Sequence, residues 1–316
     1  MPIPEKEALA GLKLLVVIAK SDGALSPEER TVLADALEGA KLPESVTSQG
    51  LLDGTYDADA LAGDVTSQEG RDVAFSACFT MAYAGRECLP QEQAILDRIG
   101  KAWAVPQEKR GLLDRILKEA RDTAWFTRVE PTVDPRHREA EVGATVLKYS
   151  VLSAALGLNP VPIVSLVTDV AVVGLQAKMF SDIGRHWGHE TTKDTARQVF
   201  AGVGVGTGLR LAANGLMKFV PGAGSVFAAS TNFASTWALG QVANQYWESG
   251  GRADLKMLRE VFVKSRADGR QAYAKHQAEV EAKGKAHQTT LRHLADDYGA
   301  GRMTLGEYER QVGELG

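Results

Sequence analysis

The sequence PVPIVSLVTDVAVVGLQAKMF at residues 160–180 opens the part of the chain, residues 160–247, around which the rest is organised. This part closes with ALGQVANQYW at residues 238–247 and is rich in Gly and Ala. Apolar residues recur at spacings of three and four, whereas alternation of Val, Ile and Thr at a spacing of two is nearly absent. The sequence therefore predicts an all-α protein, with an acidic helical domain before this part and a charged helical arm after it.

The length of 316 residues and the hydrophobic content of 44% predict two or three folded units, each with a core. Residues 1–130 carry 22 acidic and 15 basic side chains, and the remainder carries 18 acidic and 21 basic ones. No basic patch is interleaved with aromatic residues, so we expect no nucleic-acid partner. The cysteines, Cys78 and Cys88, form no C-x-x-C pair, and the apolar run 14–19 is too short for a signal-peptide core. A reduced cytoplasmic setting is expected.

The acidic residues 1–128 carry a helical pattern that occurs twice. Residues 7–20 place apolar side chains on one helical face, and an Asp-Gly turn follows. The next helix starts at residues 26–29, where Ser is the N-cap, Pro stands at N1 and Glu at N3, as in a capping box. The pattern recurs 63 residues later, with an apolar helix over 73–83 and a helix start at 90–92. This predicts a duplicated helical hairpin around one core.

Residues 19–30, AKSDGALSPEER, resemble the hallmark of the tellurite-resistance TerB-like domain, in which an apolar helix, Asp-Gly and a Ser-Pro-Glu-Glu helix start follow one another. The resemblance covers about 120 residues and implies a divalent cation, such as calcium, bound by acidic residues of the turns. The matching positions here are Asp22, Glu29 and Glu92. The second half departs from the family pattern, because Gly85-Arg86 stands where Asp-Gly is expected. Calcium takes six to eight oxygen ligands, so this carboxylate set is small.

Several of these polar residues also have a structural interpretation. Asp22 can form a turn with the glycine that follows it, and Glu29 favours a helix N-terminus. Asp169 and Asp182 interrupt apolar sequence. They serve either in capping or in a polar contact, with Asp169 able to cap the helix that follows it, or, within a membrane, they are functional acids. The segment His186-Trp-Gly-His189 is typical of a helix C-terminus, where His is favoured by the helix dipole, rather than of a metal site.

The central residues 141–250 raise the question of a membrane. Residues 149–168 are uncharged over 20 positions, which by length permits a bilayer crossing. However, Asn159-Pro-Val-Pro162 breaks this run, because proline removes a backbone donor and disfavours helix in the residue before it. Two short helices are therefore predicted. A further helix is predicted over residues 195–218, where small residues at four-residue spacing allow close packing and two basic residues interrupt the apolar character.

This central region resembles the helical domain of unknown function found in YcjF-type inner-membrane proteins and beside some bacterial GTPases. The resemblance covers about 90 residues. It implies no catalytic activity; it implies membrane association and a GTPase partner, which would be a separate protein here. The residues that carry it are Pro160-Val-Pro162, Asp169, Leu175-Gln-Ala-Lys-Met179, Ile183, Trp187-Gly188, Phe219-Val-Pro-Gly-Ala-Gly224 and Thr236-Trp-Ala-Leu-Gly240.

The C-terminal part is charged and Ala-rich. It predicts a long helical arm, which Gly269 and Gly284 should weaken, and then a short hairpin whose second helix starts with a capping box of Thr304 and Glu307. The hairpin resembles the SHOCT-type short C-terminal domain over about 26 residues, which implies an oligomerisation element. So small a hairpin needs cover from an oligomer or a partner. Its apolar face is predicted to comprise Leu291, Leu294, Tyr298, Met303, Leu305 and Tyr308.

Two functional hypotheses follow. The first is a non-enzymatic scaffold or sensor at the cytoplasmic face of, or within, the inner membrane, linked by resemblance to envelope or metal stress and forming a homo-oligomer through its C-terminal part. The second is a soluble adaptor that docks on a separate GTPase or other protein. An enzyme is a weaker third, because we find no nucleophile–base pair or metal cluster. The predicted parts are residues 1–128, a linker 129–140, a hydrophobic domain 141–250, an arm 251–285 and a hairpin 286–316.

Overall fold

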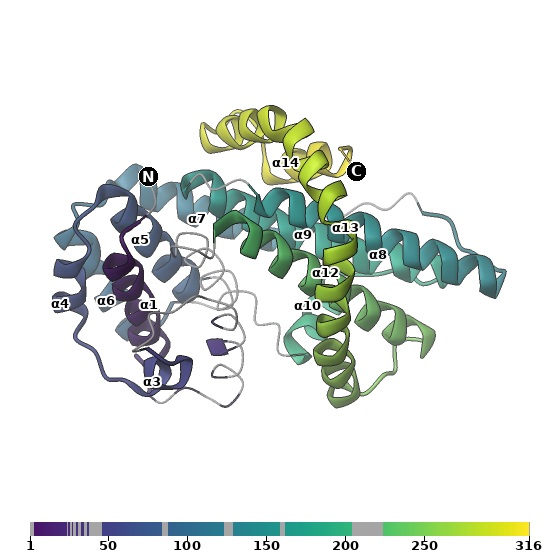
Figure 1. Ribbon diagram of the computed structural model, residues 1–316, viewed down its shortest axis with the longest axis horizontal. Helices are drawn as coiled ribbons and strands as arrows, with labels where there is room; N and C mark the ends of the chain where they lie inside the picture. Colours follow the sequence, from purple (N-terminus) through teal and green to yellow (C-terminus); the bar gives the residue numbers. More distant parts are fainter. Residues whose placement is uncertain are drawn as a thin grey trace. The chain divides into compact units, whose positions relative to one another are not determined.

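The computed structural model confirms the all-α fold, since every regular element in its described part is an α-helix (Figure 1). The chain divides into two compact units, unit 1 formed mainly by residues 1–118 and unit 2 formed mainly by residues 119–159, 167–205 and 229–316. The structure describes residues 3–23, 25, 27, 30, 33, 34, 37, 46–83, 88–122, 129–158, 162–203 and 224–315.

Unit 1 is built around its first helix. The helix predicted over residues 7–20 is present as α1, and it packs against α3, α4 and α5, while α6 packs on α4 and α5. Leu14, Leu15 and Ile18 of α1 are almost fully buried, which makes this helix the centre of the core. The sequence analysis did not predict the short helices α3 and α4. The helices are α1 (Glu5–Ala19), α3 (Ser48–Asp53), α4 (Ala58–Asp64), α5 (Gln68–Tyr83), α6 (Pro90–Ala102) and α7 (Gln107–Asp122), whose last residues, from Glu119, belong to unit 2.

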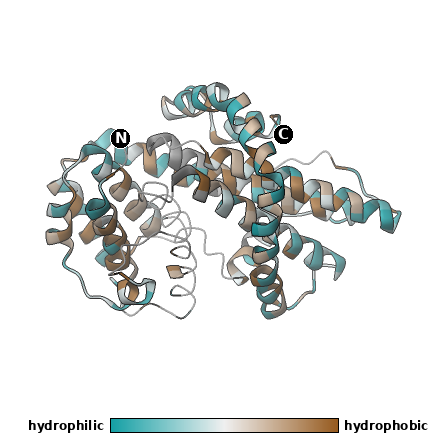
Figure 2. Cartoon of the chain, viewed as in Figure 1, coloured by the Kyte–Doolittle hydropathy of each residue, from teal (hydrophilic) through white to brown (hydrophobic). Residues whose placement is uncertain are grey.

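Unit 2 is a bundle in which the central helices and the C-terminal arm share one core. Val151 of α8, Phe233 of α12, and Tyr273 and Val280 of α13 form a buried cluster. Figure 2 shows hydrophobic residues gathered along the middle of this bundle and hydrophilic residues at the N-terminal end of α8. The helices are α8 (Pro135–Gly157), α9 (Pro162–His186), α10 (Lys193–Gly202), α12 (Gly224–Glu248), α13 (Leu255–Gly299) and α14 (Leu305–Gly313).

The predicted break in the central stretch is confirmed, since α8 ends at Gly157 and α9 begins at Pro162. The prediction that the two helices are short is wrong, because α8 has 23 residues and α9 has 25. Two other boundaries differ from the prediction. Helix α8 begins inside the predicted linker, because the Asp134 side chain accepts the N–H of His137 at 2.7 Å and Pro135 occupies N1. Helix α10 ends at Gly202 rather than residue 218; positions 204–223 lie outside the described residues.

The C-terminal arm is one helix of 45 residues, α13, which runs without interruption through the boundary predicted between residues 285 and 286. The prediction that Gly269 and Gly284 weaken it misses their role, because both lie on its buried side. A Cβ at Gly269 would stand 2.9 Å from Cα of Ala234 on α12, so only glycine permits this close approach. Buried positions recur every eleven residues along α13, at Leu258, Gly269, Val280 and Leu291. An eleven-residue repeat keeps one face of a nearly straight helix towards its neighbours.

The C-terminal hairpin has the predicted construction. The Thr304 hydroxyl accepts the N–H of Glu307 at 3.3 Å, and the Glu307 carboxylate accepts the N–H of Thr304 at 2.8 Å, which is the predicted capping box. Gly301, with φ at 74°, ends the preceding turn. Glu119 adds a cap from elsewhere in unit 2, since its carboxylate accepts the N–H of Leu305 at 2.7 Å.

The apolar face of the hairpin is covered within the same chain. Tyr298, Leu305 and Tyr308 are fully buried, while Met303 is half-buried. Helix α14 packs on α13, and it approaches α9 so closely that a Cβ at Gly174 would stand within 3 Å of the carboxylate of Glu309. An oligomer through this part of the chain would therefore need a surface other than this face.

Candidate functional site

The first candidate is the turn after α1, where the TerB-like resemblance places a cation ligand. Asp22 is exposed in a turn closed by hydrogen bonds from Ser21 to Ile18 and from Gly23 to Lys20, each 3.1 Å. Gly23 has a φ of 143°, which side chains rarely adopt, so the Asp-Gly pair forms the turn of the structural interpretation. Glu29 lies outside the described residues.

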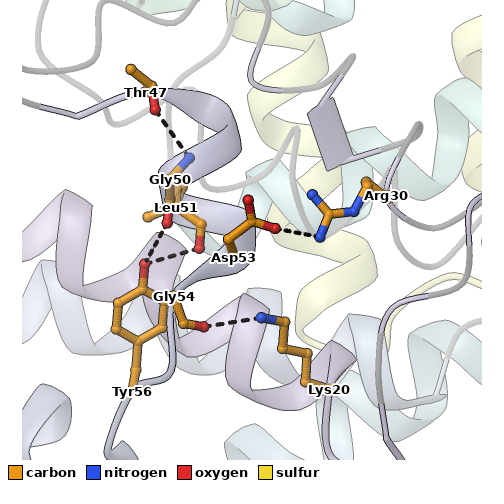
Figure 3. Close-up of polar contacts among 8 residues, drawn as sticks. All are labelled: Lys20, Arg30, Thr47, Gly50, Leu51, Asp53, Gly54 and Tyr56. Atoms are coloured by element: carbon orange, nitrogen blue, oxygen red, sulfur yellow. Dashed lines mark hydrogen bonds and ion pairs between the residues drawn. The ribbon is translucent and has the colours of Figure 1, made fainter.

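Near the end of α3, beside this turn, basic side chains bind a backbone carbonyl and a carboxylate (Figure 3). The Lys20 ammonium donates to the Gly54 carbonyl at 3.0 Å, and the Arg30 guanidinium contacts the Asp53 carboxylate at 2.5 Å. The Tyr56 hydroxyl donates to a further carbonyl of α3 at 2.9 Å. These oxygens already bind donors of the chain, so a cation would have to displace them to use them as ligands.

Glu92 acts as a helix cap. Its side chain is buried, and one carboxylate oxygen accepts the N–H of Leu89 at 2.8 Å, at the start of α6. Its position three residues into the helix beside Pro90 fits the predicted helix start. Within the described residues, no three or more His, Cys, Asp or Glu side chains are grouped so that they could hold a metal ion. A cation bound by Asp22, Glu29 and Glu92 stays a prediction.

A second buried carboxylate, which the sequence analysis did not single out, lies at the N-terminus of α5. Glu7 of α1 is 6% exposed and accepts hydrogen bonds from the Thr66 hydroxyl at 2.7 Å, the Ser67 amide at 3.1 Å and the Ser67 hydroxyl at 2.5 Å. Burial acts to raise the pKa of Glu7, but these hydrogen bonds outweigh it and hold the pKa below its ordinary value. The carboxylate is therefore ionised where it meets the positive end of the α5 dipole.

The arrangement is a capping box completed from another helix. Ser67 accepts the N–H of Gly70 at 3.0 Å, as an N-cap does, but Gly70 occupies the N3 position that normally carries Glu. Glu7 supplies the missing carboxylate from 60 residues away. A Cβ at Gly70 would stand 2.4 Å from that carboxylate, so glycine leaves the room it needs. The only sequence signal is a Ser N-cap followed by Gly at N3.

A third candidate is the set of polar side chains inside unit 2. The Tyr149 hydroxyl on α8 donates to the Asp182 carboxylate on α9 at 2.6 Å, and the Lys178 ammonium contacts the same carboxylate at 3.0 Å. Burial and the neighbouring Asp182 raise the pKa of Tyr149, which keeps the hydroxyl protonated as a donor. The predicted polar contact of Asp182 is confirmed. Of the two structural roles predicted for Asp169, a helix cap or a polar contact, the structure contradicts the cap, because Asp169 lies buried inside α9 rather than at its start.

Further polar pairs connect α9, and the turn that ends it, to α12. The Gln176 amide of α9 donates to the Thr236 hydroxyl of α12 at 2.9 Å, and both side chains are buried. The Trp187 indole donates to the Asn244 side chain at 2.9 Å, and the Trp247 indole donates to a backbone carbonyl of α9 at 3.1 Å. These polar groups thus bind one another across the bundle.

His186, at the C-terminal end of α9, is 6% exposed and contacts two threonines. Its Nδ1 lies 3.1 Å from the Thr132 hydroxyl and its Nε2 lies 3.2 Å from the Thr145 hydroxyl. Both ring nitrogens thus have protein partners, and the helix end predicted at this segment is confirmed. Burial lowers the pKa of His186, although the carboxylates of Glu141 and Asp182 act to raise it.

The chain was compared with family models, with curated proteins and with solved structures, and none of them matches it. Within the parts that the structure describes, none of the helices combines the length and the apolar character that a bilayer crossing requires. The three family resemblances therefore remain expectations from the residues that carry them.

Proposed function

We propose that this chain is a non-enzymatic scaffold or adaptor protein whose central helices form a protein core rather than a lipid-inserted segment. One observation carries this choice, namely the buried Tyr149–Asp182 pair between α8 and α9, to which the half-buried Lys178 adds an ion pair. A carboxylate inside an apolar environment is costly unless it is paired and hydrogen-bonded. Here the partners come from two helices of the same bundle.

Burial of the apolar side chains supports the same proposal. Val151 and Leu152 of α8, Leu175 of α9, and Phe233 and Leu239 of α12 are all at most 3% exposed. Among the described residues, the large hydrophobic side chains that are exposed lie before α8, at the start of α12 and in the first turns of α13, namely Val133, Val226, Leu255, Met257 and Val263. Single exposed apolar residues are ordinary on protein surfaces, whereas a lipid-facing helix needs a continuous apolar face.

The resemblances supply the rest of the proposal. The TerB-like part of unit 1 would bind a protein or a divalent cation, with Asp22, Glu29 and Glu92 as the candidate ligands. The YcjF-like helices would contact a separate GTPase or another protein at the cytoplasmic face of the inner membrane, so association with lipid would be peripheral. The SHOCT-like hairpin suggests a homo-oligomer, and the family contexts suggest envelope or metal stress.

Fractionation of cells tests the central claim. The full chain and a truncated protein ending at Arg128 are expressed, and membrane pellets are washed with high salt and with alkaline carbonate. We expect the full chain either in the supernatant or released from the pellet by one of these washes. Retention of the full chain after both washes, with the truncated protein soluble, would show insertion in lipid and would refute the proposal in favour of the membrane-inserted scaffold.

Calcium titration of the full chain tests the cation separately. Binding followed by calorimetry should be lost in Asp22→Asn if the turn after α1 supplies a ligand, and unchanged in Asp64→Asn, an acid at the end of α4 that pairs with Lys6 at 2.7 Å. Equal binding by both variants would show that Asp22 is not a ligand. No binding by the wild-type chain would exclude calcium as the cation.

A further inference from the structure

In the described part of the segment that connects α7 to α8, residues 129–134, Thr132 binds the end of α9. Its N–H donates to the His186 carbonyl at 3.1 Å, and its hydroxyl contacts the His186 ring at 3.1 Å. Its carbonyl accepts from the Arg138 guanidinium at 3.0 Å, and that guanidinium lies over the Trp187 ring at 3.9 Å from the ring centre. Backbone and side chain of Thr132 are therefore both held by the turn that ends α9.

We propose that His186 and Thr132 form a proton-operated latch, in which the neutral imidazole holds residues 129–134 against the end of α9 and protonation of the imidazole releases them. This device is independent of the scaffold role proposed above. It acts within unit 2, on a segment that the sequence analysis predicted to be a linker.

Burial of the ring, which is 6% exposed, favours its neutral form. A neutral imidazole has one donor and one acceptor nitrogen, and a threonine hydroxyl satisfies either one, so Thr132 and Thr145 complete it without a charge. An imidazolium would be a buried cation, attached to the same threonine that already binds the Arg138 guanidinium. A second positive charge beside Arg138, with little contact to water, opposes the docked arrangement.

The ionisable groups around the ring act in both directions. Glu141 on α8 and Asp182 on α9 favour the cation, whereas His137 on α8 and, most of all, burial disfavour it. Asp182 is already bound to Tyr149 and Lys178, which reduces the charge it offers to the ring. Because the pKa of His186 is lowered in the docked state, docking is favoured above the ordinary His pKa and is lost as the pH falls towards the native value.

Two measurements on the full chain test the latch. NMR titration of the wild-type His186 ring needs no variant, and we expect a pKa below its ordinary value. Hydrogen exchange at the Thr132 amide, corrected for the intrinsic pH dependence of exchange, should lose protection between pH 7 and pH 5, by up to about tenfold per pH unit for a single proton. A ring pKa at or above the ordinary value, or constant protection over this range, would overturn the proposal.

Variants separate His186 from other titrating groups. His186→Gln keeps a donor and an acceptor but does not titrate here, so protection at Thr132 should become independent of pH. Thr132→Val removes the hydroxyl and should raise the ring pKa towards its ordinary value by freeing the ring. His137→Gln, which removes an exposed imidazole, should leave the pH response in place. A response that persists in His186→Gln or disappears in His137→Gln would assign the titration to another group and refute the latch.

Discussion

Replacement of Glu7 by Gln tests whether a carboxylate from α1 stabilises the start of α5. The substitution keeps the size of the side chain and removes its charge. In the wild-type chain this carboxylate accepts from three donors, the Thr66 hydroxyl, the Ser67 amide and the Ser67 hydroxyl. Gln retains one acceptor oxygen, but its NH2 group is a donor. It would therefore face the donors that bind the second carboxylate oxygen in the wild-type chain.

The magnitude follows from these bonds. Hydrogen bonds to a charged group contribute about 1.5–3 kcal/mol, against about 1 kcal/mol for neutral pairs, so losing the charge costs about 1 kcal/mol for each bond. At least two bonds are weakened, and the partly buried dipole of α5 loses its counter-charge. We therefore expect Glu7→Gln to lower the free energy of unfolding of unit 1 by about 2 kcal/mol.

Urea unfolding followed by circular dichroism measures this change, which corresponds to a midpoint shift of about 1 M for a slope near 2 kcal/mol per M. Hydrogen exchange of the Gly70 and Arg71 amides localises the effect to the first turn of α5. The matched control is Glu108→Gln, which removes the same charge from the exposed first turn of α7 and should cost less than about 0.5 kcal/mol.

The pH dependence of the stability difference gives a second test of the capping argument. Because the native pKa of Glu7 is lowered, its contribution is fully present above the unfolded pKa and is lost as the pH falls through the native pKa. The stability gap between wild type and Glu7→Gln should therefore be constant near neutral pH and shrink in acid. A gap no larger than that of Glu108→Gln, or one that persists unchanged in acid, would refute the capping argument.

Two further predictions concern unit 2. Gly269→Ala places a Cβ against the α12 backbone and should destabilise the bundle by about 1–3 kcal/mol in urea unfolding. Gly143→Ala is the control, since it lies at an exposed helical position with nothing within 4 Å and should stabilise the bundle by about 0.5–1 kcal/mol. Stabilisation by both substitutions would show that α12 does not approach Gly269. Tyr149→Phe removes a buried donor from Asp182 and should cost about 1–3 kcal/mol by the same assay, and an unchanged midpoint would mean that water replaces the hydroxyl.

Much of the local architecture could be predicted because it depends on neighbours in sequence. The helix over residues 7–20, the helix start at Pro90, the break before Pro162 and the capping box at Thr304 each depend on side chains within a few residues of one another. The short helices α3 and α4 were not predicted, since six and seven residues hold too little periodic pattern.

The candidate site residues were harder to interpret. The sequence analysis named Glu92 only as a candidate ligand, and the structure shows that it caps α6, while Asp22 stays a predicted ligand in an exposed turn. The interior of unit 2 contains His186 and Asp182, whose partners lie on other elements. No local pattern distinguishes a histidine that ends a helix from one whose two nitrogens bind threonines 54 and 41 residues away.

The helical class, several helix boundaries and the local caps follow from the sequence alone, because backbone preferences and capping hydrogen bonds act over one or two turns. The roles of the buried polar and glycine residues depend instead on tertiary packing. Glu7 caps a helix 60 residues away, and Gly269, which lowers helix propensity, is needed because another backbone touches it. These effects depend on which helix surfaces contact one another. Burial of apolar faces is not directional, so the contacts are set by the packing of the whole chain rather than by the local sequence.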